Sequence, residues 1–173
     1  MLNYLLTNEE TERLLFRKVT NADFNEWLPF HQHPLSNRHW NGLPADPAVA
    51  CQQQLDKTLQ RYQEGSGGLH ALIRKQDQQL VGLSGLLVQE IEGRRELEIG
   101  YSILPRFWRQ GYAFEAADHI KKVAFKREWA QSLICIIQTE NIPSQKTALK
   151  LGMSVDFRTH YFNNNVAIYR IHQ

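Results

Sequence analysis

The chain has 173 residues, of which 42% are hydrophobic and 22% are charged, and its formal net charge is +2. This composition predicts one soluble globular domain over residues 1–173 and excludes a disordered or fibrous chain. Basic and acidic residues are interspersed, no apolar run approaches the ~20 residues that span a bilayer, and no signal-like segment opens the chain. We therefore expect a cytoplasmic protein whose main activity needs neither a nucleic acid nor a membrane.

The first third of the chain predicts one strand followed by two helices. Residues 13–19 carry a strand pattern, and the cap-like run that ends at Asp23 starts a helix. We expect residues 29–44 to be irregular because prolines bound this stretch. A second helix is predicted over residues 46–64, since Asp-Pro opens it and a glycine run stops it.

A meander of strands comes next. Its three strands are predicted over residues 69–74, 80–91 and 94–104. If Glu92 and Gly93 form a two-residue hairpin turn, Leu87 lies opposite Glu98 in the paired strand. Alternation along the third strand then places Glu96 and Glu98 on one face, opposite to the apolar residues between them.

The last part of the chain predicts two helices and three strands. Alanines and aliphatic residues from Ala113 to Ala124 recur with helical spacing. They are followed by a strand (133–137), a short helix (144–151) and a hairpin (153–162 and 166–171) around Asn163–Asn165. The order β-α-α-β-β-β-α-β-α-β-β indicates a mixed α/β fold. Cys51 and Cys135 lie in apolar patterns, so we expect two packed, unbridged thiols.

The loop between the third meander strand and the long helix is a candidate anion site. A helix N-terminus attracts anions, Gly111 allows close backbone approach, and Arg106 and Arg109 supply positive charge. An ordinary strand-to-helix turn with a basic surface is the alternative. The glycine-rich signatures of P-loop and dinucleotide-binding proteins are absent from the sequence.

Several segments, in order, carry a family resemblance. They are Thr11–Arg17, Glu96–Tyr101, Pro105 with Trp108–Ala113, Glu115–Ala116, Glu140–Ser144 and Leu149–Met153. Together they resemble the GNAT superfamily, and within it the branch of ribosomal-protein N-terminal acetyltransferases. The resemblance implies an α/β (α+β) fold with a mixed, mostly antiparallel central sheet, two splayed parallel strands and flanking helices.

The resemblance also implies a site for acetyl-CoA between strands 94–104 and 132–138. Backbone amides of the loop would hold the diphosphate, and the residues concerned are Trp108, Arg109, Gln110, Gly111, Tyr112 and Ala113, with Arg106 beside them. The pantetheine arm would pair with the backbone near Ile103. Asn141 matches the asparagine that contacts this arm, and Ser144 follows it at the usual interval. A capped helix start is the alternative interpretation of this segment.

For catalysis, Glu98 resembles the family's glutamate on the central strand and would act as general base. Glu96, on the same face, is its rival, and a solvated carboxylate is the alternative for either. Many relatives place a tyrosine seven residues after the asparagine to protonate the leaving thiolate. This sequence has Ala148 there. Ser144 or an unassisted thiolate therefore remains for that role.

Residues 29–44 resemble the variable segment that lines the acceptor site. His31, His33 and His39 lie in this stretch, but no carboxylate or cysteine completes a familiar ligand set, so we expect no metal. A mobile loop with aromatic anchors is the better interpretation.

The resulting prediction is an acetyl-CoA-dependent N-acetyltransferase whose amine acceptor attacks directly in a ternary complex. A weak carboxylate base slightly favours an α-amine, such as a protein N-terminus, over a lysine side chain. A small-molecule amine (a polyamine, an antibiotic or an amino acid) is the alternative acceptor, and a catalytically silent CoA-binding module is the alternative function. Monomer and homodimer both stay open.

Overall fold

The computed structural model describes residues 3–173. Its elements are β1 (Leu14–Lys18), a 3-10 turn η1 (Asn21–Asp23), α1 (Phe24–Gln32), α2 (Pro47–Glu64), β2 (Gly67–Arg74), β3 (Leu80–Ile91), β4 (Arg94–Ile103), a 3-10 turn η2 (Pro105–Phe107), α3 (Tyr112–Lys126), β5 (Ser132–Gln138), α4 (Ile142–Lys150), β6 (Ser154–Tyr161) and β7 (Asn164–His172). The predicted order of strands and helices is confirmed.

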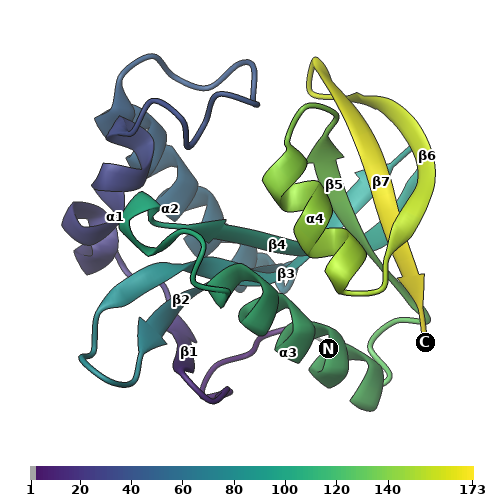
Figure 1. Ribbon diagram of the computed structural model, residues 1–173, viewed down its shortest axis with the longest axis horizontal. Helices are drawn as coiled ribbons and strands as arrows, with labels where there is room; N and C mark the ends of the chain where they lie inside the picture. Colours follow the sequence, from purple (N-terminus) through teal and green to yellow (C-terminus); the bar gives the residue numbers. More distant parts are fainter. Residues whose placement is uncertain (1–2) are drawn as a thin grey trace.

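One seven-stranded sheet organises the molecule, in the order β1-β2-β3-β4-β5-β7-β6 (Figure 1). Every neighbouring pair is antiparallel except β4 and β5, which run parallel. The predicted hairpin register is confirmed, since Leu87 lies opposite Glu98. The mixed, mostly antiparallel sheet with flanking helices is therefore the expected fold.

The two parallel strands separate almost as soon as they meet. β3 and β4 pair continuously from Gly82 and Ile103 to Ile91 and Arg94. By contrast, the ladder between β4 and β5, both within the described chain, has only the pair of Glu98 and Ile134. The C-terminal half of β4 is thus free of β5, which opens a gap in the middle of the sheet.

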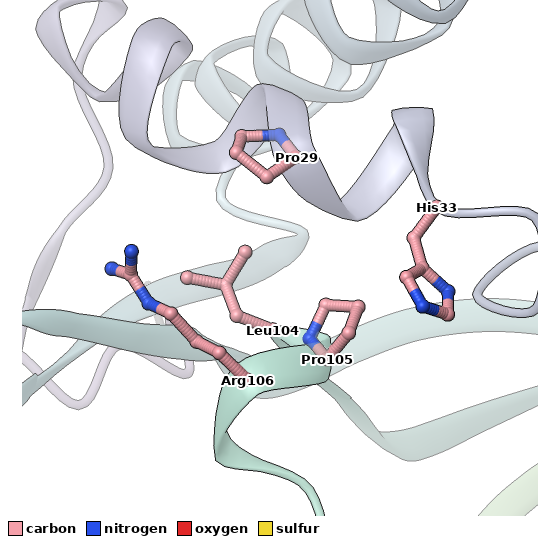
Figure 2. A pocket seen from close by; sticks show the side chains of 5 residues that line it. All are labelled: Pro29, His33, Leu104, Pro105 and Arg106. Carbon is pink, nitrogen blue, oxygen red and sulfur yellow. The ribbon is translucent and has the colours of Figure 1, made fainter.

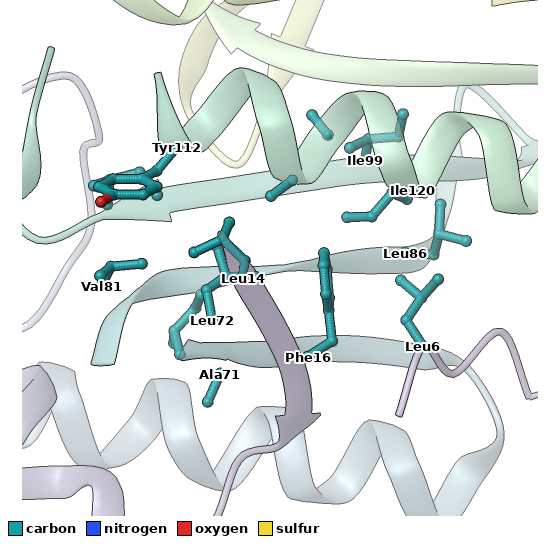
Figure 3. Close-up of a cluster of buried hydrophobic side chains, with 14 of the residues drawn as sticks. Leu6, Leu14, Phe16, Ala71, Leu72, Val81, Leu86, Ile99, Tyr112 and Ile120 are labelled. Atoms are coloured by element: carbon teal, nitrogen blue, oxygen red, sulfur yellow. The ribbon is translucent and has the colours of Figure 1, made fainter. Parts of the chain in front are cut away.

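Helices cover both faces of the N-terminal half of the sheet. Figure 3 shows α3 on one side of the strands and α2 on the other. On the α3 side, Phe16, Leu86, Ile99 and Ile120 are fully or almost fully buried. Burying such aliphatic and aromatic side chains contributes ~1.5–3 kcal/mol each, so this core fixes β4 relative to α3.

A second, smaller core packs the C-terminal half of the sheet. It consists of Ile91, Ile134, Ile136, Val166 and Ile168, with Trp40, Phe157 and Tyr161 packed against them. Trp40 comes from the loop between α1 and α2. The same loop is tied to β7, because the backbone N–H of Asn41 donates to Oδ1 of Asn164 at 2.8 Å. The loop therefore bridges the two halves of the sheet.

Two of the predicted boundaries that the structure corrects have a clear physical reason. Helix α1 continues through Pro29 to Gln32, where we expected irregular chain. A proline removes one helical hydrogen bond, and the stacking of Trp27 on Phe30, with ring centroids 4.5 Å apart, holds that turn together.

The turn between β6 and β7 is the second such boundary. It is centred on Phe162 and Asn163, which both have left-handed φ, so β7 begins at Asn164 rather than at Val166. A two-residue turn of this kind suits the twist of a hairpin, and the run of three asparagines concealed its position.

Both cysteines are free and buried. Burial raises the pKa of the Cys51 thiol to about 11, so this thiol stays protonated at neutral pH. Among residues 3–173, no helix has the length and hydropathy needed to cross a membrane.

Candidate active site

The gap between β4 and β5 is lined by polar groups from three elements. The hydroxyl of Tyr101 on β4 donates to the backbone carbonyl of Ser144 in the first turn of α4, at 2.9 Å. The thiol of Cys135 on β5 donates to the carbonyl of Ile99 at 3.3 Å. Burial raises the pKa of Tyr101 well above its usual range, so its hydroxyl remains a proton donor. Sequence reasoning missed Tyr101 because its contact with α4 depends on the splay of the strands.

Glu98 lies at the point where the two strands separate. Its half-buried carboxylate accepts a hydrogen bond from Nε2 of Gln89 at 2.6 Å. Burial raises the pKa of Glu98, while the hydrogen bond from Gln89 and the charge of Arg61 partly offset that increase. A carboxylate with a raised pKa and no ion-pair partner in residues 3–173 is suited to accept a proton.

Glu96 is on the same face but is committed to an ion pair. Its two carboxylate oxygens accept hydrogen bonds from Arg170 at 2.8 and 2.9 Å. Both side chains are only 12–13% exposed. Hydrogen bonding to Glu96 raises the pKa of Arg170, so the guanidinium stays charged. The structure therefore distinguishes the two rivals by their partners.

The N-terminus of α3 carries no side-chain cap. Gly111 occupies the cap position with φ +82°, and Arg109, two residues earlier, has φ +60°. The first backbone N–H groups of a helix have no partner within it, and left-handed residues before it turn neighbouring N–H groups the same way. By contrast, Asp46 caps α2 and Asn141 caps α4. The geometry at α3 suits an anion.

Arg13, just before β1, fixes this loop from the other end of the chain. Its Nη1 donates to the carbonyl of Gln110 at 2.9 Å, and its Nε donates to Glu115 at 2.6 Å. The guanidinium also stacks over the ring of Tyr112, 4.2 Å from the centroid. Burial alone would raise the pKa of Glu115, but hydrogen bonds from Thr11 and Arg13 lower it overall. Sequence reasoning used this segment only as a sign of the fold.

Trp108 and Ile103 are brought together in the structure. The N–H of Leu104 donates to Val81 on β3, so the carbonyl of Ile103 points away from β3 and toward the gap. This carbonyl accepts a hydrogen bond from the indole of Trp108 at 2.7 Å. The indole therefore occupies a backbone acceptor in the region where the family resemblance places the pantetheine arm.

The side chain of Arg106 lies at a cavity beside α1. It lines a cavity of about 430 Å³ between α1 and η2, together with Pro29, His33, Leu104 and Pro105 (Figure 2). Its guanidinium also packs over the ring of Phe107, 4.9 Å from the centroid.

Asn141 and Ser144 form the start of α4. Oδ1 of Asn141 accepts the backbone N–H of Ser144 at 3.3 Å. This is the capped helix start that the sequence offered as an alternative. Ala148, at the position where many relatives have tyrosine, is fully buried.

The three histidines of the α1–α2 segment have separate partners. His31 contacts Gln54 and Asn37, His33 packs edge-on against Trp108, and His39 accepts from Arg38. Burial lowers the pKa of His31. In residues 3–173, no cluster of three or more His, Cys, Asp and Glu side chains has the arrangement of a metal site.

Two cations of α2 face the same region as Glu98. Arg61 donates to Gln89, and Lys57 lies over the ring of Phe162, 6.0 Å from its centroid. Neither has an acidic ion-pair partner among the described residues. Glu98 therefore lies within reach of two positive charges from α2.

Comparisons with known proteins identify relatives of this chain. YoaA, an uncharacterized N-acetyltransferase of Bacillus subtilis, is 24% identical over 157 residues, covering 90% of this chain and 88% of that protein. YnaD, another uncharacterized N-acetyltransferase of Bacillus subtilis, is 25% identical over 143 residues, covering 83% of this chain and 80% of that protein.

Solved structures share the fold. An acetyltransferase of Agrobacterium tumefaciens superposes with a TM-score of 0.81 at 21% identity, covering 100% of this chain and 98% of that one. A ribosomal L7/L12 α-N-protein acetyltransferase in complex with coenzyme A gives a TM-score of 0.71 at 14% identity, covering 94% and 95%. The microcin C7 self-immunity acetyltransferase in complex with acetyl-CoA and AMP gives 0.75 at 11% identity, covering 94% of each chain.

The family comparison covers most of the chain. Residues 13–154 match the acetyltransferase (GNAT) domain. This range contains Glu98, the loop before α3 and the start of α4. The chain therefore belongs to the GNAT family of N-acetyltransferases.

Proposed function

We propose that this protein transfers an acetyl group from acetyl-CoA to a primary amine, and that a protein N-terminal α-amine is its acceptor. The observation that carries the proposal is the position of Glu98. Its carboxylate lies where β4 and β5 separate, beside the gap, and has no ion-pair partner in residues 3–173.

The residues around the gap are suited to bind acetyl-CoA, the acetyl donor. The uncapped N-terminus of α3 offers backbone N–H groups of Tyr112 and Ala113 to a diphosphate, and Arg109 adds positive charge. The backbone of β4 from Gly100 to Ile103 is free of β5 and can pair with an extended arm. Acetyl-CoA supplies the acetyl group as a thioester. A solved relative of the same fold holds coenzyme A, which supports this assignment.

Glu98 acts as the general base. Its carboxylate takes a proton from the attacking amine, directly or through a water molecule, as the nitrogen bonds to the acetyl carbon. The bond from that carbon to sulfur breaks, and the sulfur leaves as a thiolate. Ser144 is our candidate to protonate it, and a thiol pKa near ~8.5 also allows it to leave without help.

The charges on the acceptor side support an α-amine. An α-amine has a pKa of ~8 against ~10.4 for a lysine side chain, so one weak base deprotonates it more readily. Lys57 and Arg61 disfavour a polycationic acceptor such as a polyamine or an aminoglycoside, because like charges repel. A free amino acid presents the same α-amine and is the second acceptor to test.

A thiol-release assay with a panel of acceptors tests the proposal. The panel contains peptides with N-terminal serine or alanine, the same peptides blocked at the N-terminus but carrying lysine, free amino acids, and spermidine. We expect release of coenzyme A with the free N-termini and little with spermidine. Turnover confined to spermidine or to the blocked peptides would contradict the α-amine acceptor.

A further inference from the structure

We propose that Gln89 is a positioning residue for Glu98, and that Arg61 and Tyr161 lock Gln89 in the orientation this role requires. The inference rests on the proposed function, because it takes Glu98 as the base. It joins residues from α2, β3, β4 and β6 into one hydrogen-bond chain.

Gln89 reaches Glu98 diagonally across the β3–β4 hairpin. The register pairs Gln89 with Glu96 and Leu87 with Glu98, so residues 89 and 98 lie on one face, two positions apart. Long side chains span that diagonal. Nε2 of Gln89 donates to Oε2 of Glu98 at 2.6 Å, and no side chain in residues 3–173 donates to Oε1. Gln89 therefore holds one carboxylate oxygen, and the backbone N–H of Ile136 on β5 also acts on this carboxylate.

Two donors fix which end of the Gln89 amide faces Glu98. Nη2 of Arg61 donates to Oε1 of Gln89 at 3.2 Å, and the hydroxyl of Tyr161 donates to the same oxygen at 3.1 Å. A guanidinium has no acceptor, so an amide turned the other way would place N–H against N–H. Burial raises the pKa of Tyr161 to about 12, which keeps its hydroxyl protonated and able to donate. The amide nitrogen must therefore point to Glu98.

Arg61 is itself held in place. Its Nη1 donates to the carbonyl of Val88 at 2.9 Å and to that of Ser66 at 3.2 Å. These acceptors are neutral backbone carbonyls, so they fix the position of the guanidinium and place no carboxylate against it. The series of hydrogen bonds from Arg61 through Gln89 to Glu98 thus connects a cation to an anion. Both charges polarise the neutral amide between them.

Five other titratable groups interact electrostatically with Glu98. Lys57 and Arg61 of α2 act on it as positive charges. Tyr161 of β6 packs on the same face, and Tyr101 of β4 and Cys135 of β5 lie on the opposite face, within reach of its charge. Burial and the charge of Glu98 raise the pKa values of all three groups. Gln89 is the side chain that donates directly to the carboxylate. Its hydrogen bond stabilises the ionised form against burial, so its loss should leave Glu98 protonated at a higher pH.

The direct test is an NMR titration of the side-chain carboxyl carbon of Glu98 in the free protein, with the signal assigned by its loss in Glu98→Gln. Gln89→Met keeps the length of the side chain and removes the donor. We expect the titration midpoint to rise by about one pH unit. Gln89→Glu keeps an acceptor for Arg61 and Tyr161 but adds a second carboxylate, so the midpoint should rise further.

The matched control is Gln60→Met, which makes the same change at an exposed glutamine of α2 and should leave the midpoint where it is in the wild type. Thermal unfolding checks that each variant is folded. An unchanged midpoint in folded Gln89→Met and Gln89→Glu would overturn the positioning role. In the active enzyme, the acid limb of the pH–rate profile should shift upward by the same amount as the midpoint.

The two levels of inference fail separately. If Glu98→Gln abolishes turnover while the Gln89 variants leave the midpoint unchanged, the positioning role is wrong and the proposed base stands. If Glu98→Gln leaves turnover unchanged, Glu98 is not the base, and Gln89 has no catalytic group to position.

Discussion

The surroundings of Glu96 and of Glu98 differ although the two residues lie two positions apart on one face of one strand. Around Glu96, Arg170 donates two hydrogen bonds and also reaches Asp156 and Ser132. Around Glu98, the donor is a neutral amide, and the cation stands one residue further away. The charge of Glu96 is therefore offset by direct contact with Arg170, whereas Glu98 contacts only the neutral side chain of Gln89.

This difference teaches that role follows from partners rather than from residue type or exposure. Glu96 is held by a bidentate ion pair, so both of its oxygens are occupied. A half-buried carboxylate without such a partner holds a proton more strongly, which is what a base requires. Replacing each glutamate in turn by glutamine tests whether their different partners give them different roles.

The largest effect is expected for Glu98→Gln. Removal of a general base lowers kcat by about 10²- to 10⁴-fold, while binding of acetyl-CoA should persist because the loop before α3 is untouched. Steady-state thiol release and calorimetric titration measure the two quantities. Glu96→Gln is the matched control, with an expected change in kcat of less than about tenfold. Equal losses in the two variants would mean that the ion pair does not distinguish them.

Glu96→Gln should instead weaken the fold. It leaves the largely buried Arg170 with Asp156 as its acidic partner, and the loss of one member of such a pair costs about 2 kcal/mol or more. Chemical denaturation of both glutamine variants measures the free energy of unfolding. A Glu98→Gln protein that is destabilised more than Glu96→Gln would assign the structural role to the wrong glutamate.

A smaller effect tests the same reasoning on the opposite face of the sheet. His70 is fully buried, accepts the N–H of Leu6 at 3.1 Å, and has no partner at Nδ1 among the described residues. Burial lowers its pKa from 6.5 to about 4. The unfolded chain therefore binds a proton below pH 6.5 that the folded protein refuses until about pH 4, so stability falls as the pH is lowered through that window.

The slope that His70 contributes is at most ~1.4 kcal/mol per pH unit. Denaturation between pH 4 and 7 should show a steeper loss for the wild type than for His70→Asn. His172→Asn, an exposed control, should keep the wild-type slope. Identical slopes in the wild type and His70→Asn would show that another group governs acid stability.

Much of the fold could be predicted because local patterns determine it. A two-residue turn at Glu92 and Gly93 fixes the register of β3 and β4, and with it the shared face of Glu96 and Glu98. The position of Glu98 followed from the family resemblance. Its distinction from Glu96 did not, because Arg170 lies 74 residues away and reaches Glu96 only through the pairing of β5 with β7.

The other residues near Glu98 and the loop before α3 could not be predicted either, because they also depend on contacts between residues far apart in the sequence. Gln89 and Arg61 carry no motif, and their contacts arise from the packing of α2 on the sheet. Arg13 meets Glu115 across 102 residues. Periodicity identifies which face a residue occupies, but it does not identify which distant side chain will lie opposite. The left-handed glycine at the start of α3 could be anticipated, because a glycine at a helix start has a local, physical meaning.

Glu98 can act as a base only if acetyl-CoA binds beside it, so the most direct measurement is calorimetric titration of acetyl-CoA into wild type, Gly111→Val and Gly93→Val. Gly111 and Gly93 both have left-handed φ, at +82° and +74°, but Gly93 lies in the β3–β4 turn. We predict saturable binding to the wild type and to Gly93→Val, and binding at least ~10-fold weaker to Gly111→Val. No binding to the wild type, or equal binding to all three proteins, would contradict the assignment of the donor to the N-terminus of α3.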